Sequence, residues 1–165
     1  WIQNENEGGG RIVGEVCHFI DLMTFLTDAH PLSVFAQAVS AKSDKILDGD
    51  SVFITLKFSD GSNGTIAYLG EGDKALAKER IEIFGAGRSF VLDDFRRALS
   101  YKDGRENQVA LKAQDKGQAD EVRAVCASIL SGGVAPISLE ELTTTTRATF
   151  RVLDSLREGQ PMLVE

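Results

Sequence analysis

The sequence predicts an α+β fold, with one open, mainly antiparallel β-sheet of about six or seven strands and helices packed on one face. Three observations lead to this prediction. Strand-like segments fill the middle of the 165-residue chain, short turn sequences join most of them, and helix-like periodicity is confined to the two ends. Short turns favour antiparallel neighbours, because parallel strands need a crossover of about a dozen residues or more. We expect a single domain spanning residues 1–165.

The first predicted helix runs from Glu15 to about Thr27. Its apolar residues recur at spacings of three and four, as in a helix with one buried side. They are Val16, Phe19, Ile20, Met23 and Leu26. Glu15 suits the first turn, where a carboxylate meets the positive end of the helix dipole. At about 100° per residue, His18 and Asp21 fall on the side away from the apolar stripe.

The strands are predicted from alternation of apolar and polar residues. They lie around residues 32–39, 52–58, 64–68, 81–83, 90–92, 95–101 and 109–111. In the first of them, Leu32, Val34, Ala36 and Ala38 are expected to point inward. Residues 59–62, Ser-Asp-Gly-Ser, supply the turn of the clearest hairpin. Residues 42–50 are expected to form a polar loop.

Two helices are predicted near the C-terminus, each opened by a capping box. In this motif the N-cap and N3 side chains each accept a hydrogen bond from the other residue's backbone N–H. The two boxes are Asp115 with Gln118 and Ser138 with Glu141. We expect the first helix to end at Gly132 and the second at Gly159, because glycine adopts the left-handed conformation common after a helix C-terminus.

The composition argues against several partners. The net charge is −7 and the Lys and Arg residues are scattered, so no basic stripe could neutralise a phosphate backbone, and we expect no nucleic acid. No apolar run approaches the roughly 20 residues that span a bilayer, so we expect no membrane association. Cys17 and Cys126 fall in helix-like apolar patterns, which favours buried thiols and a cytoplasmic location. The chain opens on Trp1, which indicates a cut inside a longer polypeptide.

The spacing of residues near the first helix weighs against three kinds of chemistry. Glycines 8, 10 and 14 resemble a dinucleotide fingerprint, but no strand-like segment precedes them. Cys17 and His18 point about 100° apart in a helix, which disfavours a nucleophile and base pair. His18, Asp21 and Glu15 do not converge at a metal-ligand spacing, so we predict no metal site. Spacing alone leaves His18 either structural or catalytic.

The segment from Gly8 to Leu22 resembles the opening of the C-terminal domain in the glucose-fructose oxidoreductase, inositol dehydrogenase and rhizopine catabolism (Gfo/Idh/MocA) family. In that family a glycine pair leads to a helix of the form Asp-x-x-x-His-x-x-Asp-Leu. Four later segments resemble the branch in which this unit follows a zinc-type alcohol dehydrogenase-like region, the bi-domain oxidoreductases. These segments are residues 58–62 (FSDGS), 78–84 (KERIEIF), 92–96 (LDDFR) and 114–117 (QDKG).

The resemblance implies a division of labour between two domains. An N-terminal Rossmann domain, absent from this sequence, would bind NAD or NADP and supply a lysine from a Glu-Lys-Pro motif. The C-terminal domain would form the pocket for a sugar-like substrate. His18 matches the family histidine, which is the general acid or base on the substrate hydroxyl, a task that suits an imidazole with an ordinary pKa of about 6.5. Asp21 matches the family's second aspartate and is expected to hold the helix or orient local groups.

One position departs from the family motif. Gly14 stands where the family has an aspartate, four residues before His18, and the nearest carboxylate, on Glu15, is displaced by one residue. Glu15 can replace the aspartate only if the local backbone differs from an α-helix. Arg11 and Lys116 are further candidates for binding an anionic substrate or cofactor phosphate, with solvated surface as the alternative.

Taken together, these features predict the substrate-binding and oligomerisation domain of an NAD(P)-dependent oxidoreductase that acts on a sugar, polyol or nucleotide-sugar hydroxyl. The isolated chain is expected to be inactive. The alternative is a non-catalytic scaffold or ligand-binding module with the same fold. We expect a homo-oligomer through the open sheet face, because large apolar residues fall on that face. These residues are Phe35, Val39, Phe53, Leu69 and Phe84.

Overall fold

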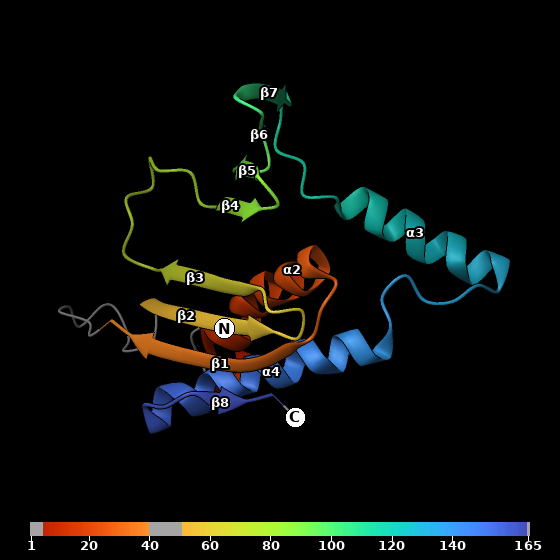
Figure 1. Ribbon diagram of the computed structural model, residues 1–165. Coiled ribbons are helices and arrows are strands. Elements are labelled where there is room, and N and C mark those ends of the chain that lie inside the picture. Colours follow the sequence, from red (N-terminus) through yellow and green to blue (C-terminus); the bar gives the residue numbers. More distant parts are fainter. Residues whose placement is uncertain (1–4, 40–50, 165) are drawn as a thin grey trace. The chain divides into compact units, whose positions relative to one another are not determined.

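The computed structural model describes residues 5–39 and 51–164, and the chain divides into two compact units (Figure 1). Unit 1 comprises Trp1–Glu71 and Ile137–Glu165, and unit 2 comprises Gly72–Pro136. Each unit holds a four-stranded antiparallel sheet, with strand orders β3-β2-β1-β8 and β4-β5-β6-β7. The predicted α+β class and antiparallel pairing are confirmed, but the described strands form two sheets in place of one. The loop predicted at residues 42–50 lies outside the described residues.

Unit 1 packs helices against one face of its sheet. Its elements are α1 (Glu5–Gly8), a π-helix η1 (Ile12–Val16), α2 (Cys17–Thr27), β1 (Pro31–Ala38), β2 (Ser51–Phe58), β3 (Asn63–Leu69), α4 (Leu139–Glu158) and β8 (Met162–Leu163). Helix α4 contacts β1 and β8, and α2 contacts α4 (Figure 1). The predicted positions of the first and last helices are confirmed. Strand β8 escaped prediction because two residues carry no alternation.

The core of unit 1 forms between the sheet and these helices. Its buried apolar side chains include Ile12, Val16, Ile20, Val34, Ala36, Val52, Ile54, Leu56, Phe58, Ile66, Ala148 and Val152. Val34 and Ala36 point inward as predicted. The prediction for Ala38 is wrong, because this residue is exposed at the end of β1. The prediction for Leu32 is also wrong, because the pairing of β1 with β2 shifts between Pro31 and Ser33. This irregularity leaves Pro31 buried and Leu32 45% exposed.

Buried hydroxyl groups tie α4 to the sheet and to itself. Ser155 is fully buried; its Oγ accepts a hydrogen bond from the Ala36 N–H at 2.9 Å and donates to the Gln160 carbonyl at 2.7 Å. It thereby satisfies a backbone donor at the β1 edge. The buried Thr149 hydroxyl donates to the Thr145 carbonyl at 2.8 Å, so this polar group is satisfied within α4 itself.

One of the two predicted capping boxes is present. The Ser138 N–H donates to Glu141 Oε2 at 2.7 Å and the Glu141 N–H donates to Ser138 Oγ at 3.1 Å. Hydrogen bonding to the side chain and backbone of Ser138 lowers the pKa of Glu141. The box of Asp115 with Gln118 is wrong. Gly117 is the N-cap there, with a φ of 81°, and the Asp115 carboxylate accepts from the Gly117 N–H in a local turn.

Unit 2 is a four-stranded meander followed by a helix. Its elements are β4 (Arg80–Gly85), β5 (Arg88–Asp93), β6 (Arg97–Lys102), β7 (Arg105–Ala110) and α3 (Gln118–Ser131). Helix α3 ends at Gly132 with a φ of 64°, as predicted. The Cys126 thiol on α3 is free and exposed, contrary to the prediction of a buried thiol. Within residues 5–39 and 51–164, no helix combines the length and apolarity that a bilayer crossing requires.

Candidate functional site

The glycine run and the segment after it form a left-handed turn and a π-helix. Gly9 and Gly10 have φ angles of 71° and 81°, a region that favours glycine. Residues Ile12–Val16 then form η1, in which the N–H groups bond five residues back along the chain. Turns of this kind are rare in proteins, and those that do occur are often found at functional sites. The backbone around Glu15 therefore differs from an α-helix, which is the condition for Glu15 to replace the family aspartate.

The spacing of buried residues accounts for the wide turn. Ile12, Val16, Ile20 and Thr24 are all buried, and each lies four residues from the next. In an α-helix, a step of four residues overshoots a full turn by about 40°, so this row would drift away from the core. A wider first turn reduces the drift and keeps Ile12 in the core. Gly14 lies in this turn and η1 continues directly into α2.

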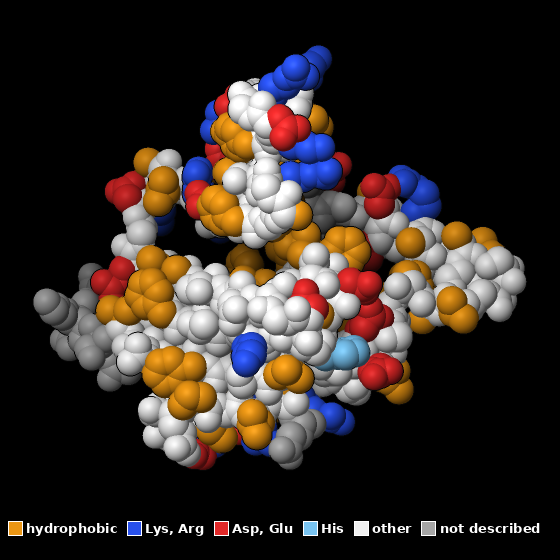
Figure 2. Space-filling model, in the orientation of Figure 1, with side chains coloured by type: hydrophobic (Ala, Val, Ile, Leu, Met, Phe, Trp, Pro, Cys, Tyr) orange, Lys and Arg blue, Asp and Glu red, His pale blue; other side chains and the backbone are white. Residues whose placement is uncertain are grey.

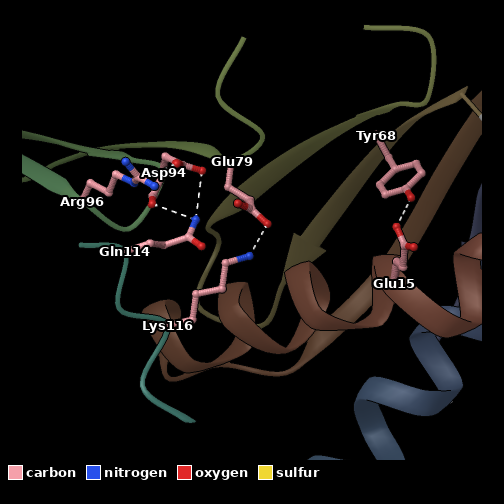
Figure 3. Close-up of polar contacts among 7 residues, drawn as sticks. All are labelled: Glu15, Tyr68, Glu79, Asp94, Arg96, Gln114 and Lys116. Carbon is pink, nitrogen blue, oxygen red and sulfur yellow. Dashed lines mark hydrogen bonds and ion pairs between the residues drawn. The ribbon is translucent and has the colours of Figure 1, made fainter. Parts of the chain in front are cut away.

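The structure joins Glu15 and Arg11 through a tyrosine of strand β3, Tyr68. Figure 3 shows the contact of Tyr68 with Glu15. The Tyr68 hydroxyl donates a hydrogen bond to Glu15 Oε2, and Arg11 Nη1 donates to the Tyr68 oxygen at 3.3 Å. Tyr68 is half-buried. Burial first, and then its hydrogen bond to Glu15, raise the pKa of Tyr68, so its hydroxyl keeps its proton near neutral pH. A predicted site carboxylate is thus held against the sheet.

The other candidates on α2 have different surroundings. His18 is exposed, as the periodicity predicted. Asp21 Oδ1 accepts a hydrogen bond from Thr145 Oγ1 at 3.4 Å, which links α2 to α4. Burial raises the pKa of the Cys17 thiol, and the nearby Asp21 carboxylate adds to this shift. A thiol with a raised pKa is a poor nucleophile at neutral pH, which agrees with the argument against Cys17 and His18 as a nucleophile and base pair.

Lys116 lies in unit 2 and is engaged by its own neighbours. Its ammonium group is 2.6 Å from Glu79 Oε1 (Figure 3). The same group lies 5.5 Å from the centroid of the Phe95 ring. The side chain of Lys116 is one-third exposed and that of Glu79 is 16% exposed. The ion pair is therefore partly shielded from water. Arg11 and Lys116 belong to different units, and each already has a protein partner.

Three of the segments that resemble the family meet around this lysine. Gln114 Nε2 donates to both the carbonyl and the carboxylate of Asp94 at 3.0 Å, and the Asp94 N–H donates to the Glu79 carbonyl at 2.7 Å (Figure 3). Asp94 and Phe95 have φ angles of 50° and 53°, which close a tight turn between β5 and β6. The motif residues 78–84, 92–96 and 114–117 thus form one structural corner of unit 2.

Sequence reasoning missed Tyr68 as a member of the site. Alternation along β3 indicates that Gly64, Ile66 and Tyr68 share the inward face, and the register confirms that they lie opposite Leu56, Ile54 and Val52 of β2. Alternation along a strand does not predict which residue of a helix an inward side chain will contact. Glu15 and Tyr68 are 53 residues apart in the sequence.

The described residues offer neither a metal centre nor a dinucleotide cradle. In residues 5–39 and 51–164, no three His, Cys, Asp or Glu side chains are grouped so as to hold a metal ion. All described strand pairs are antiparallel, whereas a dinucleotide cradle needs a parallel strand followed by a glycine turn and a helix N-terminus. The described strands therefore do not form a Rossmann-type dinucleotide-binding unit.

Solved structures of oxidoreductases share the fold. Aldose-aldose oxidoreductase from Caulobacter crescentus, complexed with glycerol, is 17% identical with a TM-score of 0.81, over 99% of this chain and 50% of that one. UDP-N-acetylglucosamine 3-dehydrogenase from Acidithiobacillus ferrooxidans is 20% identical with a TM-score of 0.77, over 95% and 50%. An oxidoreductase from Agrobacterium radiobacter, in complex with NAD+, L-tartaric acid and magnesium, is 15% identical with a TM-score of 0.74, over 91% and 48%.

These likenesses establish the fold, and the chain spans about half the length of each of these proteins. No curated protein sequence matches the chain. A family profile does: the one described as the GFO/IDH/MocA C-terminal domain matches residues 1–91, which include the glycine turn, η1, α2 and the strands β1 to β3. The chain therefore belongs to the Gfo/Idh/MocA family of oxidoreductases, as a C-terminal domain.

Proposed function

We propose that this chain is the substrate-binding and oligomerisation domain of an NAD(P)-dependent oxidoreductase that acts on a sugar, polyol or nucleotide-sugar hydroxyl. The observation that carries the proposal is an exposed histidine, His18, on the helix that follows the glycine turn in a member of this family. The substrate class draws on two proteins of like fold, an aldose-aldose oxidoreductase and a UDP-N-acetylglucosamine 3-dehydrogenase.

In this proposal His18 handles a proton and a second domain handles the cofactor. NAD or NADP, bound by an N-terminal Rossmann domain, supplies the hydride acceptor. The His18 imidazole takes the proton of the substrate hydroxyl while the carbon that bears this hydroxyl is oxidised to a carbonyl. In the reverse reaction it returns the proton. Glu15 is the carboxylate proposed to support His18, because it lies three residues before His18, in the π-helix η1 that continues directly into α2.

A substrate screen tests this function. We expect the full-length protein that contains this chain to reduce NAD+ or NADP+ when supplied with sugars, polyols or nucleotide sugars, measured by the absorbance of the reduced nicotinamide. The isolated 165-residue chain is the control, and we expect it to show no cofactor-dependent turnover. Turnover by the isolated chain would contradict the assignment of the cofactor to another domain.

The alternative is a non-catalytic scaffold or ligand-binding module. Gly14 favours it, because a glycine at the family's aspartate position contributes no side-chain charge or hydrogen bond. A scaffold would retain the fold of unit 1 and would show the same turnover with and without His18. The two functions therefore differ in one measurable quantity, the dependence of turnover on the imidazole.

We further propose that the open face of the unit 1 sheet mediates self-association. Val39, Phe53 and Leu69 are each more than two-fifths exposed, and Phe53 lies beside Gln37 and Ala67 in the register. Of the other two residues predicted on this face, Phe35 is half-buried, and Phe84 lies in β4 of the unit 2 sheet, which corrects its assignment. Hydrophobic side chains are visible on the surface of unit 1 in Figure 2. Antiparallel sheets that face water usually carry polar residues on that side.

Light scattering over a concentration series tests the association. We expect the mass of the full-length protein to exceed that of one copy, and Phe53→Asp to shift the equilibrium toward the monomer by placing a charge on an apolar contact surface. Thr55→Asp on the same strand and face is the matched control for added charge, with a smaller expected effect because it removes no large apolar group. A wild-type protein that stays monomeric at high micromolar concentration would contradict the proposal.

A further inference from the structure

Strand β3 contacts the continuous helical segment formed by η1 and α2 at two points. At one, a Cβ on Gly64 would lie 2.5 Å from Met23 Sδ, so the glycine allows close approach to α2. At the other, the Tyr68 hydroxyl reaches the Glu15 carboxylate in η1. The strand rises about 13 Å between its two contacts and the helix about 12 Å between Met23 and Glu15. The strand and the helical segment therefore run antiparallel, and they cover nearly the same length between the two contacts.

The Tyr68 hydroxyl makes its two hydrogen bonds in opposite senses. It donates to Glu15 Oε2 and accepts from Arg11 Nη1, so the groups on either side fix its orientation. The ring extends from the inward face of β3, where Tyr68 lies opposite Val52 of β2 in the register. A rigid two-torsion side chain on a paired strand gives the carboxylate a fixed reference point in the sheet.

We propose that Tyr68 is a positioning residue that holds the Glu15 carboxylate beside the helix surface that carries His18. Without the hydroxyl, the Glu15 side chain gains rotamers that point into solvent, and the wide turn of η1 loses this side-chain link to the sheet. The inference deepens the proposed function and rests on it, because it adds Tyr68 to the site of His18. Its physical part, the coupling of Tyr68 to Glu15, can be measured without turnover.

The coupling is measured by ¹⁹F NMR on the full-length protein labelled with 3-fluorotyrosine. The signal of residue 68 is assigned by its loss in Tyr68→Phe, and its ionisation is followed against pH. We expect Glu15→Gln to lower the pH at which this residue ionises, because the substitution removes a negative charge that opposes tyrosinate formation. Tyr101, hydrogen-bonded to Glu106 in unit 2, is the internal control and should titrate unchanged. An equal titration of residue 68 in both proteins overturns the proposal.

Kinetics test the positioning role. We expect Tyr68→Phe to lower kcat about tenfold with KM little changed, since small displacements of catalytic groups cost up to about 10²-fold. Tyr101→Phe, the matched loss of a glutamate-bound hydroxyl, should leave kcat unchanged. Because Tyr68 acts through Glu15, the double variant Tyr68→Phe/Glu15→Gln should be no slower than Glu15→Gln alone. A wild-type kcat in Tyr68→Phe, or additive losses in the double variant, overturns the proposal.

The two proposals fail in different ways. If the wild-type protein oxidises no sugar, polyol or nucleotide sugar, the proposed function fails, and the NMR titration still decides whether Tyr68 is coupled to Glu15. If His18→Ala abolishes turnover but Glu15→Gln leaves the ionisation pH of residue 68 unchanged, the proposed function stands and the role of Tyr68 is overturned.

Discussion

Replacing His18 by alanine in the full-length protein should lower kcat by about 10²-fold or more, the usual contribution of a general acid or base. His18 is exposed on α2, so its removal leaves the core row of Ile12, Val16 and Ile20 untouched. The expected loss therefore reflects the missing proton transfer and not unfolding. Initial rates with the substrate found in the screen, together with a thermal unfolding curve, measure the two effects separately.

The second histidine of the chain provides a matched control. His30 is also exposed and lies just before β1, and its backbone N–H donates a hydrogen bond to Ser59 Oγ at 3.2 Å. His30→Ala keeps that bond and should leave kcat unchanged. Equal turnover in wild type and His18→Ala would contradict general acid or base catalysis and favour the scaffold. An equal loss in both variants would show that the effect is not specific to α2.

The sequence predicts the features of this fold that depend on local signals. The box of Ser138 and Glu141 forms because both residues act on backbone groups within one turn. The hairpin at residues 59–62 forms for a similar reason, since Asp60 accepts hydrogen bonds from the N–H and hydroxyl of Ser62. Asp115 and Gln118 also have the residue types of a capping box. The Asp115 carboxylate, however, accepts a hydrogen bond from the N–H of Gly117, and the left-handed Gly117 is the N-cap of α3.

Features that depend on distant partners could not be predicted in the same way. Alternation identifies strands, yet it does not say which strands share a sheet, so one predicted sheet became two. A single irregularity between Pro31 and Ser33 reverses the inward assignment of Leu32, while the same period-two pattern is correct for Val34 and Ala36. The wide turn at Glu15 and its contact with Tyr68 depend on packing between segments far apart in the chain. For that reason the candidate site was predicted only as far as its helix.

The core of unit 1 should depend strongly on Phe58, the largest of its fully buried side chains. Phe58 ends β2 and is 1% exposed, with its backbone in the hairpin that leads to β3. Phe58→Ala should lower the free energy of unfolding by about 3–5 kcal/mol, because it removes buried apolar surface and leaves a cavity. That loss is a large fraction of the roughly 5–15 kcal/mol by which a domain is stable. Chemical denaturation followed by circular dichroism measures it.

Phe25 on α2 is the matched control, because it is the same residue type at 79% exposure. Phe25→Ala should change the free energy of unfolding by no more than about 0.5 kcal/mol, as surface substitutions usually do. The comparison is valid when both variants keep the wild-type dependence on denaturant, since a changed slope would signal a different unfolded or intermediate state. Equal midpoint shifts would contradict the packing described for unit 1. A large shift confined to Phe58→Ala would support the packing described for the core of unit 1.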